Sequence, residues 1–266
     1  MNIIQRNFFR LLRSGVLNEY ESLEPMSAFK WNRLVQMIEV QGVSPIALKG
    51  IKNHTYDENA NIPKALVDIL SPQAKPTDDK PLPRLSNPVL NKRLHKIQTE
   101  ERHHIDASMT TLDLLNIIVD NAVHILNKGI PLSGITELGR FLRTRGDKVD
   151  FVKLEKWLSS LHLQRMAQLE GSILIAVFGF EQAEIPFVRK EEPAAYNLTI
   201  RTLNHTEKDT SEDWNFRQNS IGFVSNNSTT MRRNLRRSIR YFGYAPIETT
   251  SNYFYNFVKS LSEIEE

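Results

Sequence analysis

The densest group of side chains able to bind a metal ion lies near residue 100. It consists of Glu100, Glu101, His103, His104 and Asp106, and each Glu stands three residues before a His. Di-iron helical bundles use this Glu-x-x-His spacing, but they need a second such helix and two further inward-facing glutamates. The chain has no second copy of the motif. The ligand set is incomplete, which favours a solvated helix face with salt bridges over a metal centre.

Other catalytic motifs are missing or have simpler explanations. The sequence has no Gly-rich phosphate loop, no Walker motif and no recognisable Ser/His/Asp spacing. Gly171-Ser172 lies inside a helical apolar run, which favours a packing role. His124 falls on the most apolar segment, where we expect a core or boundary histidine bonded to one backbone group. Asp147 and Asp150 flank a helix start and can cap its free N–H groups. We therefore predict no catalytic residue, no metal ligand and no cofactor.

Composition narrows the class of protein. Of the 266 residues, 40% are apolar and 24% are charged, as in ordinary globular proteins. The formal net charge of +3 is too small to indicate a nucleic-acid partner by itself. The lack of cysteine excludes disulfides, thiolate metal sites and cysteine nucleophiles, and it fits a reducing compartment. Arginines interrupt the apolar residues near the N-terminus, and no apolar run approaches a membrane span, so we predict a cytoplasmic protein.

Four consecutive helices are predicted within residues 108–187, and the rest of the chain is expected to be arranged around them. Their stops are Gly129, Gly146 and Gly179, while Asp150 can cap the third helix. The apolar residues between these stops recur at helical spacing, and short connections favour antiparallel neighbours. We expect this region to form the core.

The flanking regions are also predicted to be helical, with two exceptions. The expected helices are residues 3–17, 27–42, 45–51, 63–70 and 88–105, followed by two near the C-terminus. The exceptions are a Pro-rich linker or surface loop at 71–88 and an irregular polar excursion at 191–220. No alternating pattern indicates a sheet. The sequence thus predicts an all-α bundle of about eight to ten helices, divided into segments 1–70, 71–88 and 89–266.

An arginine-rich helix near the C-terminus is the most suggestive surface feature. Met231, Leu235, Ile239 and Phe242 share one of its faces, and the remaining positions carry Arg232, Arg233, Arg236, Arg237 and Arg240. Three interpretations are open: the apolar face packs on the domain, or the helix binds a nucleic-acid backbone or an anionic membrane surface. A narrow apolar face and acidic residues in the preceding loop favour the first of these.

Several helical segments share a pattern with known proteins. They are Phe8 to Arg13, Trp31 with Leu34, VQMIEVQGVSPIAL at 35–48, GITELGRFLRTRGDKVDFVKLEKWL at 134–158, MAQLEGSILIAVFGFEQAEIPF at 166–187, and the basic and aromatic ending at 231–258. Together they resemble an uncharacterised nucleotidyltransferase-like family found among bacterial polysaccharide-associated proteins. The resemblance implies an α/β core between the flanks, with a strand ending in Leu-Lys-Gly and an Asp-x-Asp pair that holds metal ions.

The sequence lacks the catalytic core that this resemblance implies. Leu48-Lys49-Gly50 echoes the family's strand end, but no Asp-x-Asp pair is present and residues 51–108 are too few and too rich in proline. We therefore predict a non-catalytic helical interaction or scaffold protein that docks a protein partner or self-associates. Two alternatives are a nucleotidyltransferase-type enzyme with a degenerate or unrecognised site, and a peripheral binder of anionic membrane or nucleic acid through 229–258.

Overall fold

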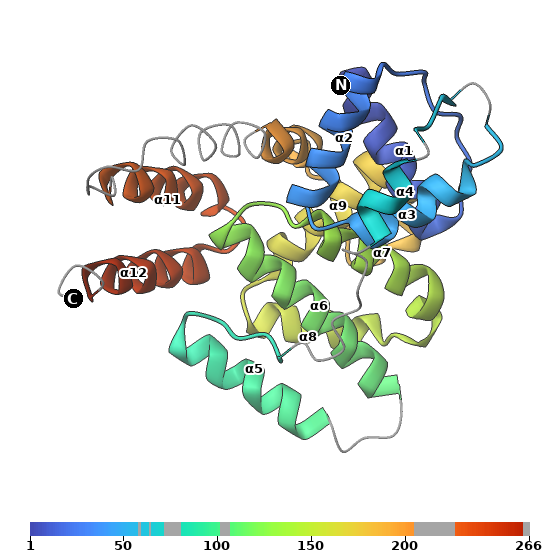
Figure 1. Ribbon diagram of the computed structural model, residues 1–266. Coiled ribbons are helices and arrows are strands. Elements are labelled where there is room, and N and C mark those ends of the chain that lie inside the picture. Colours follow the sequence, from blue (N-terminus) through green and yellow to red (C-terminus); the bar gives the residue numbers. More distant parts are fainter. Residues whose placement is uncertain (58–59, 64, 72–80, 102–106, 205–226, 263–266) are drawn as a thin grey trace.

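Helices form all the regular structure in the part of the chain that is described (Figure 1). The computed structural model describes residues 1–266 except 58–59, 64, 72–80, 102–106, 205–226 and 263–266; it also leaves the side chains of 107–108, 227–233 and 259–262 undescribed. Within these limits there are twelve α-helices and no strand. The all-α prediction is confirmed, and the predicted number of eight to ten helices is slightly too low.

Most helices begin and end close to the predicted positions. Their bounds are α1 Ile3–Leu17, α2 Ala28–Val40, α3 Ser44–Asn53, α4 Ala65–Leu70, α5 Pro88–Glu101, α6 Ala107–Asn127, α7 Leu132–Arg145, α8 Phe151–Ser160, α9 Gln164–Phe178, α11 Asn227–Tyr241 and α12 Pro246–Ser262. The four predicted central helices are α6 to α9. Asp150 accepts a hydrogen bond from the Lys153 N–H and caps α8, while Gly179 ends α9 at a φ of 71°.

The irregular excursion predicted at 191–220 is wrong for most of the part that the structure describes, although residues 191–194 are not helical. Residues 195–204 are helical, and Ala195, Thr199 and Leu203 are buried. Their spacing of four places these three side chains on one face of a helix, although only two of them are apolar. Five of the ten residues are apolar, and Tyr196, Leu198 and Ile200 also pack against the core, so the sequence did contain a signal for this helix. Residues 205–220 lie outside the described part of the chain.

The Pro-rich segment covers the surface where it is described. Within residues 81–87, Leu85 is buried and its N–H donates to the side-chain oxygen of Asn91 on α5. The Pro83 carbonyl accepts a hydrogen bond from Gln98, also on α5. This end of the predicted linker therefore packs along α5, and residues 72–80 lie outside the described residues.

The longest helix, α6, runs through the core. Its segment Met109–Asn127 is long and apolar enough to cross a membrane by length and composition, contrary to the expectation that no run approaches this limit. However, 56% of that segment is buried inside the protein. Leu114, Leu115, Ile118 and Val119 are fully buried. The apolar character of α6 is explained by its contacts with α5, α7, α8 and α9.

The N-terminal helices share this core. The rings of Phe9 on α1 and Phe178 on α9 meet edge to face with centroids 6.1 Å apart. Arg143 on α7 donates hydrogen bonds to Glu19 at 2.8 Å and to Glu184 at 3.0 Å, which ties the chain after α1 to the central helices. Helix α1 therefore packs directly on α7 and α9.

Two glycines allow α1 and α3 to cross at very short range. A Cβ on Gly50 of α3 would overlap the Leu11 carbonyl group, and one on Gly15 of α1 would overlap the Ile46 carbonyl group. The obstacles are backbone atoms, which no side-chain rotation can move away. Gly50 belongs to the Leu48-Lys49-Gly50 sequence, which is helical here and is no strand end. Its function in this fold is close packing.

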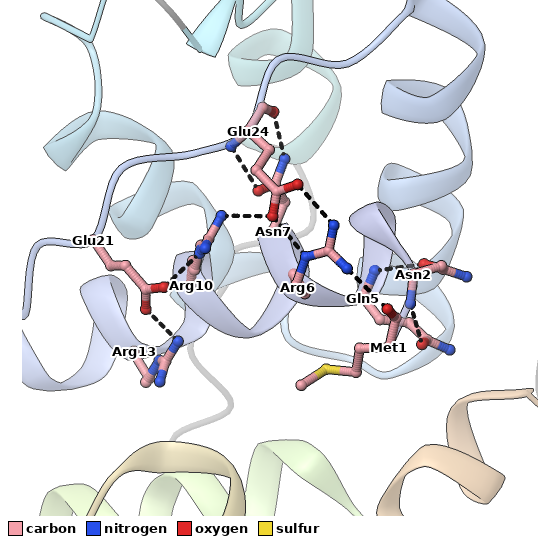
Figure 2. A network of polar contacts seen from close by, with 9 residues as sticks. All are labelled: Met1, Asn2, Gln5, Arg6, Asn7, Arg10, Arg13, Glu21 and Glu24. Carbon is pink, nitrogen blue, oxygen red and sulfur yellow. Dashed lines mark hydrogen bonds and ion pairs between the residues drawn. The ribbon is translucent and has the colours of Figure 1, made fainter.

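The arginines of α1 hold the following loop in place (Figure 2). Arg6 and Arg10 donate hydrogen bonds to the carboxylate of Glu24, while Arg10 and Arg13 do so to Glu21. Asn7, which is fully buried, exchanges two hydrogen bonds with the backbone of Glu24, at 2.7 and 2.9 Å. The polar face of α1 therefore anchors residues 18–27 rather than remaining free in solvent.

This network predicts an acid-sensitive contribution to stability. The Arg6 hydrogen bonds lower the pKa of Glu24 to about 2, from an ordinary value of 4.5. Because the folded pKa is depressed, the stabilisation is present above pH 4.5 and is lost as the pH falls toward 2. Replacing Glu24 with Gln should lower the thermal midpoint at pH 6 and leave it unchanged near pH 2. Circular dichroism melts across this range test the expectation, with the exposed Glu191→Gln as the control. A constant difference between Glu24→Gln and the wild type at every pH would contradict it.

Candidate functional site

Helices α11 and α12 form an antiparallel hairpin that projects from the other helices, with its turn next to the body (Figure 1). The Tyr244 N–H donates to the Tyr241 carbonyl at 2.9 Å, which closes the turn. Pro246 then starts α12 at the first helical position, where its missing N–H costs nothing. The predicted break between the two C-terminal helices is confirmed. The turn at this break lets α12 run antiparallel to α11.

One buried carboxylate attaches the base of α12 to the start of α5. Glu248 is only 2% exposed, and it accepts the backbone N–H groups of Ser86 and Asn87. The Asn87 side chain donates to Ser251 at 2.9 Å and also accepts from Leu90 at the first turn of α5. The same residues therefore cap α5 and fix α12 to it.

A second attachment joins both hairpin helices to the end of α6. Arg237 on α11 donates to the Asn127 carbonyl, and the side chain of Asn256 on α12 donates to the Asn127 side-chain oxygen at 3.1 Å. Tyr241, at the end of α11, is fully buried. The hairpin is thus anchored at its base by polar contacts and one aromatic residue.

Three of the four residues that define the apolar face of α11 have described side chains and all three are exposed, so the expected packing of this part of the face on the domain is wrong. Leu235 is 43% exposed, Ile239 68% and Phe242 52%. Helix α12 adds a second exposed group, consisting of Ile247, Phe254, Tyr255 and Val258. Among the described residues, seven of the seventeen large exposed apolar side chains lie within residues 235–258. Single apolar residues on a surface are ordinary, but such a concentration is typical of an interaction surface.

The five predicted arginines have different environments. Arg236 is exposed, and Arg237 and Arg240 are partly buried. Arg237 serves the attachment to Asn127, so it is not a free member of a binding surface. Arg232 and Arg233 lie on α11, but their side chains are outside the described part. Arg240 lies close to the hydroxyl of the buried Tyr241, so among the described side chains it is Arg236 that carries the basic character of the outer surface.

The cluster of ligand-type residues near residue 100 has a structural use where it is described. Glu101 accepts a hydrogen bond from Lys153 at 2.7 Å and joins α5 to α8, while Glu100 forms an i,i+4 ion pair with Lys96 at 3.6 Å. His103, His104 and Asp106 lie outside the described residues. No group of three or more metal-binding side chains comes together in the remainder of the structure that is described.

The other residues considered for chemistry mostly support packing. A Cβ on Gly171 would overlap Val188, and Ser172 bonds both Gln168 and Glu192, which confirms the packing role of this pair. His124 is exposed, contrary to the expected core or boundary position, although it contacts the Asp120 carbonyl at 3.3 Å.

An open pocket of about 490 Å³ lies between α6 and α7. Its charged lining residues are Asp113, Glu137, Arg140 and Arg145, two of each sign. Burial raises the pKa of Asp113, and Arg145 lies 3.7 Å from its carboxylate. The lining charges balance, so this pocket presents no net charge that would select an ionic ligand.

One buried carboxyl group was not predicted from the sequence. Glu170 on α9 is fully buried; one of its oxygens accepts a hydrogen bond from Asn121 at 3.1 Å, and the other has no hydrogen-bond partner among the described groups. Burial raises the pKa of Glu170 well above its ordinary value, and the Asn121 amide offsets only part of this effect. The sequence did contain a signal for this burial, because Glu170 shares a helix face with the apolar residues Met166 and Ile173, at spacings of four and three.

Comparison with known proteins gave no match to a protein-family model, to a curated protein or to a solved structure. The resemblance of the helical flanks to nucleotidyltransferase-like proteins therefore remains a prediction.

Proposed function

We propose that this protein is a non-catalytic, cytoplasmic interaction protein that docks through the outer surface of the α11–α12 hairpin. The observation that carries the proposal is the exposure of apolar side chains on both helices, from Leu235 to Val258. Leaving such side chains in water is unfavourable by roughly 25 cal/mol per Å² of apolar surface. A binding partner that covers them recovers this free energy.

The construction of the hairpin also supports docking. Its base is held by Glu248 and Asn127, and its turn by Tyr241, so the exposed surface is presented in a defined direction. A surface that is ordered before binding loses less conformational entropy when the partner arrives. The proposal retains the family resemblance of the flanks, with these helices serving as the scaffold that supports the hairpin.

Site-specific photo-crosslinking in cells tests this function. A benzoylphenylalanine at Ile239 or Phe254 should give a discrete, saturable adduct, because these side chains lie on the docking surface. Matched controls are Phe29 on α2 and Val152 on α8, which are 68% and 67% exposed and lie outside the hairpin. Equal yields from hairpin and control positions would exclude docking at this surface. The chemical nature of the adduct identifies the class of partner.

A further inference from the structure

We propose that the hairpin of α11 and α12 docks on an anionic lipid membrane, with its exposed apolar side chains inserted among the lipids and its arginines bound to headgroup phosphates. This inference rests on the proposed docking function and names the class of partner for that surface.

The charge of the hairpin fits such a partner. Helix α11 carries five arginines and no acid, whereas α12 carries Lys259 and the single acid Glu248 and is followed by Glu263, Glu265 and Glu266. Glu248 is buried and occupied by two backbone N–H groups, so it does not neutralise the outer surface. Positive charge next to apolar side chains on one surface is the combination that interfacial helices use on anionic membranes.

The geometry of α11 places the two kinds of group side by side. Leu235, Ile239 and Phe242 recur at spacings of four and three, which puts them on one stripe of the helix. Arg236 follows Leu235 by one residue, so it lies about 100° around the helix from that residue, and it is exposed. Arg240 is partly buried and lies close to the hydroxyl of the buried Tyr241. A guanidinium group in the position of Arg236 can bind phosphate oxygens with two hydrogen bonds while the apolar side chains enter the lipid layer.

Helix α12 adds aromatic residues suited to the same boundary. Phe254 is 60% exposed and Tyr255 62%. Aromatic side chains with a polar group, such as tyrosine, concentrate at the level of lipid headgroups. The projection of the hairpin from the body allows it to reach a flat surface (Figure 1).

The alternative partners fit these observations less well. A second copy of this chain that docked through α11 would bring the arginines of two α11 helices together, and like charges in contact oppose association. A nucleic-acid backbone would bind the arginines but would leave Ile239 and Phe254 in water. An anionic membrane satisfies the charged and the apolar groups together.

Vesicle co-sedimentation of the full chain tests the proposal. Binding is expected with vesicles of phosphatidylglycerol and phosphatidylcholine, and not with phosphatidylcholine alone. Arg236→Glu should weaken binding by about fivefold or more, which is the effect of one basic residue near such a surface. Ile239→Ser should weaken it by about tenfold, through the loss of inserted apolar surface. The matched controls are Arg201→Glu and Val152→Ser, exposed residues on other helices that should leave binding unchanged.

Circular dichroism is used to check that all variants remain folded. Any one of three outcomes would overturn the membrane proposal. These outcomes are equal binding to neutral vesicles, insensitivity to Arg236→Glu, and binding to duplex DNA that Arg236→Glu weakens and Ile239→Ser does not. Sedimentation velocity that shows self-association lost in Ile239→Ser, without vesicle binding, overturns the membrane partner but leaves docking through the hairpin intact. Uniform crosslinking yields at hairpin and control positions would overturn both.

Discussion

Replacing Gly50 with alanine is expected to lower the free energy of unfolding by about 3 kcal/mol, the upper part of the range for overpacked cores. A Cβ at this position would lie 2.9 Å from the Leu11 carbonyl carbon and 3.1 Å from its Cα, and closer still to the carbonyl oxygen. Since these atoms belong to the backbone of α1, relief requires the two helices to move apart. That movement would disturb Leu11, Leu12 and Ile51, which are buried around the crossing.

Urea-induced unfolding followed by circular dichroism measures this effect, and Gly146→Ala supplies the control. Gly146 lies after α7 at a φ of −60°, and a Cβ there meets nothing within 4 Å. Its replacement should be neutral, or should stabilise the protein by up to about 1 kcal/mol by restricting the unfolded chain. Equal stability of the two variants would show that α1 and α3 do not cross at the observed distance.

Replacing Glu170 with glutamine is expected to stabilise the protein at neutral and alkaline pH. Burial raises the folded-state pKa of Glu170, so the folded protein retains a proton that the unfolded chain releases above pH 4.5. The contribution of Glu170 to the stability of the wild type therefore decreases as the pH rises from 4.5 toward the folded-state pKa. Glutamine cannot ionise, and its side-chain oxygen can still accept the hydrogen bond from Asn121.

The predicted signature is a difference in thermal midpoint that is absent near pH 4 and grows in favour of Glu170→Gln toward pH 8. Differential scanning calorimetry at several pH values measures it. Glu155→Gln on α8 is a suitable control, since Glu155 is partly exposed and pairs with Arg189 at the surface. Parallel pH profiles for Glu170→Gln and the wild type would mean that Glu170 is ionised in the folded protein.

The helices themselves were largely predictable. The structure places α1 at the predicted residues 3–17, and the stops at Gly129, Gly146 and Gly179 separate the central helices as expected. Such features depend on hydrogen bonds and side-chain contacts between residues three or four apart, so a local pattern contains them. Residues 195–204 escaped prediction although five of the ten are apolar, since they stand within the longer and mostly polar stretch 191–220.

The candidate site was only partly predictable. The arginines and the apolar face of α11 were recognised from their spacing, but the assumption that the apolar face would be covered was wrong. The buried residue at this end of α11 is Tyr241, and Ile239 remains exposed. Periodicity indicates that a helix has two faces; it contains no information about which face meets the body.

Local residue patterns were sufficient to predict the all-α class, the positions of most helices and the basic, aromatic character of the C-terminal region. Only the folded structure shows that Gly15 and Gly50 form a close helix crossing, that Glu170 is enclosed, and that Leu235, Ile239 and Phe242 face solvent. The physical reason is that helix formation depends on neighbours within one turn. Burial instead depends on which segments distant in the chain come together, and on the direction in which anchors such as Glu248 and Asn127 hold them.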